Sequence, residues 1–187
     1  MTSDLFKNKY RVESARLQDW DYSSNGYYFV TICIKNREYL LGQIENDEIA
    51  LSEMGEVAKQ CWHEIPDHFP FVKLDEFVIM PNHIHGIIVI TENVETQHIA
   101  SLQRKGPNKF GPQSENLASI VRGFKSGVKK WAMVKGINFE CQPRFYDRII
   151  KNEEELWNVR NYIQHNHLKW NEDEENPDSK KVSPEPT

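Results

Sequence analysis

Residues 77–90 constrain the fold of this chain most, because two apolar runs flank the short turn Pro81-Asn82. The second run begins with two histidines one residue apart, His83 and His85. Side chains alternate between the two faces of a β-strand, so we expect both histidines on one face and Ile84 in the core. Neutral imidazole is a common metal ligand, and a rigid strand would hold the pair in position. The spacing fits half of a divalent-metal site, and it also fits a polar sheet edge.

The composition predicts one soluble globular domain with a tail at each end. Hydrophobic residues make up 39% and charged residues 27% of the 187-residue chain. No run approaches the roughly 18 apolar residues of a membrane span, and the polar N-terminus is unlike a signal peptide. Three cysteines, far apart and without a CxxC pair, favour isolated thiols in a reducing cytoplasm over disulfides or a zinc ribbon.

The net charge of −5 is unevenly distributed along the chain. Residues 171–187 hold six acidic residues and two lysines, a composition typical of a disordered tail. Residues 101–150 carry ten basic and three acidic residues, a net charge of +7. A local basic region of this kind is typical of a surface that binds a polyanion, and equally of a solvated helix face.

The hydrophobic pattern predicts an N-terminal extension over residues 1–20, an α+β domain over 21–170 and the acidic tail over 171–187. Strands are expected at residues 27–34, 71–80 and 83–91, with a hairpin at 39–51. Helices are expected from a Ser52 cap to about Phe69, over 115–134, and from an Asn152 cap to Leu168 or Trp170. Residues 92–114 predict a long loop, and 139–150 an irregular segment or short strand. This order favours a ferredoxin-like sandwich, a mainly antiparallel sheet with helices on one face and the first strand beside the histidine strand.

The last expected helix carries Tyr162 and Asn166, four residues apart and therefore on one face, roughly 6 Å apart at Cβ. Taken alone, such a tyrosine is typical of packing and such an asparagine of a helix cap. A tyrosine hydroxyl can cut a phosphodiester if a metal polarises the phosphate and neutralises charge in the transition state. Imidazoles and an amide oxygen can hold Mg²⁺ or Mn²⁺, so His83 and His85 with this pair supply the required groups.

Four stretches of the sequence, two of which contain the histidines and the tyrosine described above, occur in a characteristic order. They are residues 16–33, which contain Tyr-Tyr-Phe-Val-Thr-Ile-Cys; 78–86, Val-Ile-Met-Pro-Asn-His-Ile-His-Gly; 117–126, Leu-Ala-Ser-Ile-Val-Arg-Gly-Phe-Lys-Ser; and 145–170, which begin Phe-Tyr-Asp-Arg. In this order they resemble the HUH superfamily of single-tyrosine transposases, and specifically the REP-associated tyrosine transposases of the insertion-sequence transposase family. Each stretch alone is common, whereas the ordered set is specific.

The resemblance implies a metal-dependent single-strand DNA endonuclease and strand transferase that cuts hairpin-bearing DNA. His83 and His85 match the ligands of a divalent metal, Mg²⁺ or Mn²⁺, and Asn166 matches a third ligand. Tyr162 matches the nucleophile that would form a 5′-phosphotyrosine bond and release a 3′-hydroxyl. Basic residues would follow the DNA backbone: Arg122, Lys125, Lys129, Arg144 and Arg148. The implied setting is the bacterial cytoplasm at the nucleoid, as a monomer or homodimer on single-stranded or hairpin DNA and without a membrane.

The chain departs from the family pattern at two positions. Relatives usually have Asn-Pro after the tyrosine, whereas Asn166 is followed by His167, so His165 and His167 are alternative ligands. Position 148 is arginine where relatives often carry histidine. Tyr146 is a competing nucleophile, but it is expected in an extended segment without a ligand at a helical offset.

Two other functions fit parts of the sequence. A non-catalytic module on the same fold would bind single-stranded nucleic acid by stacking bases on Tyr27, Tyr28 and Phe29. Such a module gives no reason for paired histidines opposite a tyrosine helix. A small metallohydrolase would instead use His63 and His68 together with the paired histidines.

Overall fold

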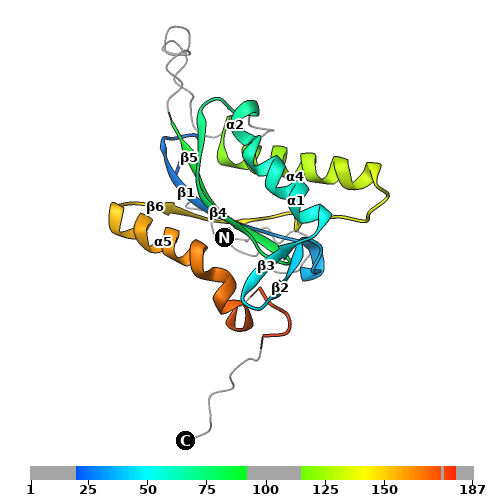
Figure 1. The fold of residues 1–187 in the computed structure, drawn as a ribbon. Helices are drawn as coiled ribbons and strands as arrows, with labels where there is room; N and C mark the ends of the chain where they lie inside the picture. The colour runs from blue at the N-terminus through cyan, green and yellow to red at the C-terminus, as the bar shows by residue number, and fades with distance from the viewer. Residues whose placement is uncertain (1–19, 92–114, 174, 180–187) are drawn as a thin grey trace, which may run out of the picture.

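The computed structural model of the protein describes residues 20–91, 115–173 and 175–179. A four-stranded antiparallel sheet lies at its centre, with strands in the order β4-β5-β1-β6 (Figure 1). The strands are β1 (Gly26–Cys33), β4 (Val72–Ile79), β5 (His83–Ile90) and β6 (Tyr146–Ile150). The predicted ferredoxin-like α+β class is confirmed, because this is the strand order of a βαββαβ sandwich with β1 beside the histidine strand.

Helices cover both faces of the sheet (Figure 1). One face carries α1 (Glu53–His63), α2 (Ile65–His68) and α4 (Leu117–Val134), and the other carries α5 (Glu153–His165). The larger core, under α1 and α4, includes Tyr28 and Ile84, while Phe29 and Ile87 lie in a smaller core under α5. Placing all helices on one face was therefore wrong for α5. Since adjacent residues of the central strands are both apolar, each face of the sheet needs a cover.

The predicted hairpin follows β1 as β2 (Gly42–Glu45) and β3 (Glu48–Leu51). Its turn residues Asn46 and Asp47 have φ of 51° and 63°, the left-handed region that a tight hairpin turn requires. The next helix starts as predicted, because the Ser52 hydroxyl accepts a hydrogen bond from the Gly55 N–H at 3.1 Å. The helix does not continue to Phe69, however. It breaks at Glu64, since Pro66 has no N–H to donate to a carbonyl one turn back.

The last helix, α5, begins where the sequence predicts and ends early. Asn152 Oδ1 accepts a hydrogen bond from the Glu155 N–H at 2.8 Å, which fixes the start. The chain then tightens after His165 into the 3₁₀ helix η3 (Asn166–Glu172), so the predicted end at Leu168 or Trp170 was wrong. The tighter winding leaves Asn166 buried and brings the ring of Trp170 to 6.0 Å from that of His83.

Several sequence predictions fall outside the described residues. They include all but the last residue of the 1–20 extension and the whole 92–114 loop with Arg104, Lys105 and Lys109. Within the predicted tail, residues 171–173 and 175–179 are described, and Asn176 is buried there. Among the helices described, none is both long and apolar enough to cross a membrane.

Gly86, which follows the second histidine, lies where the sheet meets α1. A Cβ added there would approach the ring of Trp62 to 2.3 Å. Trp62 is fully buried, with its ring centroid 5.7 Å from that of Phe77 and 5.6 Å from that of Phe124, so it has little room to move. We expect Gly86→Ala to lower the free energy of unfolding by about 1–3 kcal/mol, measured by urea denaturation.

Gly127→Ala is the matched control, because a Cβ at Gly127 would meet its nearest atom, Cys61 Sγ, at an ordinary 3.4 Å. Gly127 lies inside α4, where alanine is favoured over glycine by up to about 1 kcal/mol. The control should therefore be as stable as the wild type or more so. Wild-type stability for Gly86→Ala would show that the Trp62 ring can shift.

Candidate metal centre and tyrosine site

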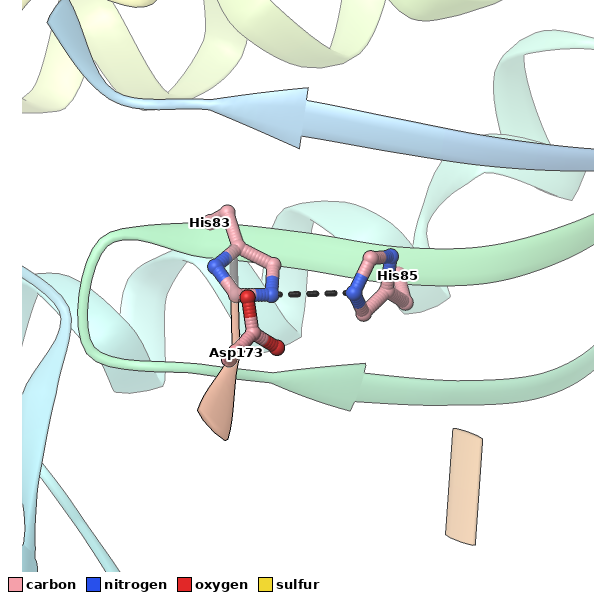
Figure 2. Close-up of side chains that lie close together, drawn as sticks. All are labelled: His83, His85 and Asp173. Atoms are coloured by element: carbon pink, nitrogen blue, oxygen red, sulfur yellow. Dashed lines mark hydrogen bonds between the residues drawn. The ribbon is translucent and has the colours of Figure 1, made fainter. Parts of the chain in front are cut away.

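His83 and His85 lie at the start of β5, opposite Cys33 and Thr31 of β1. Both are buried, at 0% and 4% exposure, on the sheet face that α5 covers. Their Nε2 atoms point toward each other and are 3.0 Å apart (Figure 2). Strand alternation thus places the pair on one face, as the sequence predicts, and Ile84 packs in the core on the other.

The far nitrogen of each ring is held by a neighbouring polar side chain. His83 Nδ1 lies 2.8 Å from Asn82 Oδ1, and His85 Nδ1 lies 2.9 Å from Thr31 Oγ1. The Asn82 amide is oriented because its Nδ2 donates to the carbonyls of Arg37 (3.2 Å) and Glu175 (2.7 Å). Its Oδ1 must then accept from His83 Nδ1–H, so His83 Nε2 is unprotonated and directs its lone pair toward His85 Nε2. Such a partner on the outer nitrogen fixes ring orientation in metal-binding histidines.

Burial keeps both imidazoles neutral. Desolvation lowers the pKa of His83 to about 3, and the nearby charge of Arg37 adds to the effect. Desolvation also lowers the pKa of His85 to about 3, with a further lowering by His83 and an opposing effect of Asp173. Both rings are therefore unprotonated near pH 7, which is the form that binds a metal.

The donor atoms suit a divalent ion. Two nitrogens at right angles around one ion, each about 2.1 Å from it, lie about 3.0 Å apart. The two Nε2 atoms have this separation, and an oxygen of Asp173 lies with them in a group whose atoms are all within 4.8 Å of one another (Figure 2). Two imidazoles and a carboxylate can bind Mg²⁺ or Mn²⁺, so the residues present fit a metal centre.

Tyr162 stands beside this group. Its hydroxyl oxygen is 3.2 Å from His85 Nε2, and its ring centroid is 5.2 Å from that of His85. The ring also meets Phe29 edge to face at 6.0 Å. Tyr162 is 45% exposed, so its hydroxyl lies between the buried histidines and solvent. A substrate could reach the tyrosine and the histidine pair at once.

Asn166, the predicted third ligand, follows the last residue of α5 and is 3% exposed. Its Oδ1 is buried and has no hydrogen-bond partner among the described residues. A buried acceptor of this kind costs free energy unless a further group binds it. Of the alternative ligands, His165 Nδ1 lies 2.9 Å from the Asn161 carbonyl, and His167 Nδ1 is buried without a partner in the described part of the chain.

The predicted DNA-binding residues are divided between the two faces of the sheet. Arg122, Lys125 and Lys129 lie on α4, on the face opposite α5. Lys125 donates to the carbonyls of Gln142 (2.6 Å) and Arg144 (3.1 Å), and Lys129 pairs with Glu140 at 3.4 Å.

The other two residues of the set, Arg144 and Arg148, are closer to Tyr162 in sequence. Arg144 is exposed just before β6, and Arg148 is exposed on β6 opposite Phe29, where it pairs with Glu155. Because cross-strand partners share a face, Arg148 belongs to the same face as Tyr162.

The structure weighs against the two other functions. Tyr28 is fully buried and Phe29 is 8% exposed, so only Tyr27, at 37%, presents an aromatic surface from the predicted stacking set. His63 and His68 lie on α1 and α2, on the far face from His85. Neither joins the metal-binding group that the described residues form.

No protein-family model matches the chain. A Haemophilus influenzae protein of uncharacterised function is 42% identical over 178 residues, covering 93% of this chain and 98% of the relative. A second protein of that organism, provisionally named a REP-associated tyrosine transposase, is 28% identical over 151 residues, which cover 80% of this chain and 74% of the relative. A solved REP-associated tyrosine transposase bound to a REP hairpin shares the fold, with a TM-score of 0.56 at 19% identity over 82% of this chain and 73% of that one.

The chain is thus similar in sequence to a protein named as a REP-associated tyrosine transposase, and it shares the fold of a solved one. The resemblance drawn from the four sequence stretches is thereby confirmed.

Asp173 is the member of the His83–His85 group that sequence reasoning missed. It lies in the acidic run 172–175, whose composition is typical of disorder. Its place beside His85 depends on the 3₁₀ turn after α5 and on contacts with residues far away in the chain. The only local signal for Asp173 is that it follows the candidate ligand Asn166 by seven residues, and such a spacing is common.

Proposed function

We propose that the protein is a metal-dependent single-strand DNA endonuclease and strand transferase that cuts hairpin-bearing DNA through Tyr162. The observation that carries the proposal is the 3.2 Å separation between the Tyr162 hydroxyl and His85 Nε2, in a pair of neutral, buried histidines. A nucleophile and a metal site side by side are what tyrosine-dependent phosphodiester cleavage requires.

In the proposed reaction the Tyr162 oxygen attacks the scissile phosphorus. The phenol proton passes to solvent, a tyrosine–phosphate bond forms on the 5′ side, and the bond from phosphorus to the 3′ oxygen breaks. The departing oxygen takes a proton from solvent and becomes a 3′-hydroxyl. Attack by a 3′-hydroxyl on the phosphotyrosine reverses these steps, and joins a new strand when that hydroxyl belongs to one.

His83 and His85 would hold the divalent metal, Mg²⁺ or Mn²⁺, with Asn166 as a further ligand. A bound ion would polarise the phosphate and neutralise the charge that develops on it. Asn82 and Thr31 keep the imidazoles oriented, and the packing of Tyr162 on Phe29 restricts its ring. The protein thus positions the nucleophile before substrate arrives, which lowers the entropic part of the barrier.

The DNA backbone would be bound by Arg148 on the face of Tyr162, by Arg144 just before β6, and by Arg122, Lys125 and Lys129 of α4 on the opposite face. Phosphate contacts position a strand without reading its sequence. In a bacterial cell the protein would act in the cytoplasm at the nucleoid, as a monomer or homodimer.

The proposal is tested with a labelled hairpin oligonucleotide and purified protein. With Mn²⁺ we expect a covalent protein–DNA species that survives denaturing electrophoresis, and with EDTA we expect none. Hairpin binding without any covalent product, in either Mg²⁺ or Mn²⁺, would favour the non-catalytic binding module instead.

Asn166→Ala tests the further ligand. The substitution removes a buried amide oxygen that has no hydrogen-bond partner among the described residues, so we expect Mn²⁺ affinity and the rate of adduct formation to fall roughly 10-fold or more. Isothermal titration with Mn²⁺ and a time course of adduct formation provide the two measurements. Asn161→Ala, five residues earlier and inside α5, is the control and should leave Mn²⁺ affinity within about twofold of the wild type. Unchanged affinity in Asn166→Ala would remove Asn166 from the metal centre.

A further inference from the structure

The segment that follows η3 returns to the histidine strand instead of leaving the domain. We call Asp173 together with residues 175–178 the C-terminal latch. Figure 1 places this segment below the sheet, beside the β2–β3 hairpin, and Figure 2 places Asp173 against His83. Its composition is acidic, yet its contacts are specific and reach the groups that orient the histidines.

The first set of contacts joins the latch to the turn before β5. The Glu175 carbonyl accepts a hydrogen bond from Asn82 Nδ2 at 2.7 Å. The Glu175 carboxylate pairs with Arg37 at 3.2 Å and lies 3.4 Å from the Cys33 thiol, which donates to it. Because Asn82 Oδ1 is the partner of His83 Nδ1, the latch helps to fix the amide that orients the first histidine.

The second set of contacts anchors the latch to η3 and to Tyr39. Asn176 is 4% exposed, and its Nδ2 donates to the Trp170 carbonyl at 2.8 Å. The Tyr39 hydroxyl lies 2.8 Å from both Asn176 Oδ1 and Asp178 Oδ2, and the Tyr39 ring packs edge to face on Trp170. A buried asparagine with this many partners restricts the backbone on either side of it.

Asp173 is thereby held beside the histidines. Its Oδ1 accepts from the Glu175 N–H at 2.7 Å, and a carboxylate oxygen lies within 4.8 Å of the ligand nitrogens of His83 and His85. Both histidines are neutral, and the buried Asn166 oxygen has no partner among the described residues. A divalent ion would supply the positive charge that this arrangement of donors lacks.

We infer that Asp173 is a carboxylate ligand of the metal that His83 and His85 hold, and that the C-terminal latch keeps it in place. The inference rests on the proposed metal-dependent function and extends the metal centre beyond α5. A carboxylate among neutral donors strengthens the binding of hard divalent cations such as Mg²⁺ and Mn²⁺. It also reduces the net charge of the loaded centre from +2 to +1, which leaves attraction for one phosphate.

The test measures Mn²⁺ binding to the full chain without DNA, by the loss of the free-ion signal in electron paramagnetic resonance. Asp173→Asn keeps the shape of the side chain and removes its charge, so we expect at least about a 10-fold loss of Mn²⁺ affinity. Glu172→Gln removes the neighbouring, exposed carboxylate and is the matched control, expected within about twofold of the wild type. Thermal melts without metal show whether each variant is folded.

Tyr39→Phe tests the latch itself. The substitution keeps the ring against Trp170 and removes the hydroxyl that bonds Asn176 and Asp178, so Asp173 stays in the chain but is held less firmly. We expect a roughly 3- to 10-fold loss of Mn²⁺ affinity in a folded protein. Wild-type affinity in Tyr39→Phe would refute the latch, and wild-type affinity in Asp173→Asn would refute the ligand.

Failure of the inference can be told apart from failure of the proposed function. If the wild type forms the Mn²⁺-dependent adduct while Asp173→Asn binds Mn²⁺ normally, only the inference is overturned. If the wild type binds no Mn²⁺, the metal-dependent function and the inference both fall. Loss of Mn²⁺ affinity in Asp173→Asn, with Glu172→Gln unaffected, supports the inference whether or not the chosen oligonucleotide is cut.

Discussion

Tyr162→Phe should abolish the covalent protein–DNA adduct while leaving the protein folded. The phenol oxygen is the proposed nucleophile, so its removal leaves nothing to form the phosphate bond, and we expect adduct yield to fall at least about 1,000-fold. The phenylalanine ring retains the edge-to-face contact with Phe29. The hydroxyl contact with His85 is lost from a half-exposed side chain, so the free energy of unfolding should change by about 1 kcal/mol or less.

The matched control is Tyr146→Phe. Tyr146 is 50% exposed on β6, and its ring lies 6.4 Å from that of Phe29. It pairs with Thr31 across β1 from His85, so the whole of β1 separates it from the histidine strand. It is the competing nucleophile by sequence, so Tyr146→Phe should form adduct as the wild type does. If Tyr162→Phe still cross-links to the hairpin with Mn²⁺, or if Tyr146→Phe alone loses the adduct, the assignment of Tyr162 is wrong.

The strands and caps of this protein could be predicted from local sequence. β-Branched and aromatic runs mark β1, β4 and β5, and alternation alone puts His83 and His85 on one face with Ile84 on the other. Ser52 and Asn152 cap their helices through hydrogen bonds to residues three positions later. These features depend on interactions within a few residues, which is why sequence patterns carry them.

The position of α5 and the role of Asp173 could not be read in the same way. Periodicity identifies the buried stripe of α5 as Leu156, Val159 and Ile163, but it does not say which face of the sheet that stripe meets. Asp173 reaches His85 only because the chain tightens at Asn166 and because Asn82 bonds the Glu175 carbonyl, 93 residues away in sequence. Such long-range contacts leave no short motif.

His85→Ala is expected to remove metal binding and, with it, cleavage. His85 Nε2 lies 3.0 Å from His83 Nε2 and 3.2 Å from the Tyr162 hydroxyl, so its loss takes away a ligand and a neighbour of the nucleophile together. We expect Mn²⁺ affinity to fall roughly 100-fold, the upper end of the range for the outer-shell partners of metal ligands, because His85 would bind the ion directly. For the wild type, Mn²⁺ at 100 times its Kd should raise the free energy of unfolding by about 2.7 kcal/mol, and His85→Ala should lose this increase.

His68→Ala is the control, because His68 is exposed on α2 and outside the metal-binding group. It should keep both the Mn²⁺-dependent stabilisation and the adduct. Hairpin binding without metal separates the two leading functions further. Since the basic residues do not depend on His85, the His85→Ala protein should bind the hairpin within a few-fold of the wild type and still fail to cut it. A variant that cut the hairpin without binding Mn²⁺ would remove the metal from the mechanism and leave Tyr162 to act through protein groups alone.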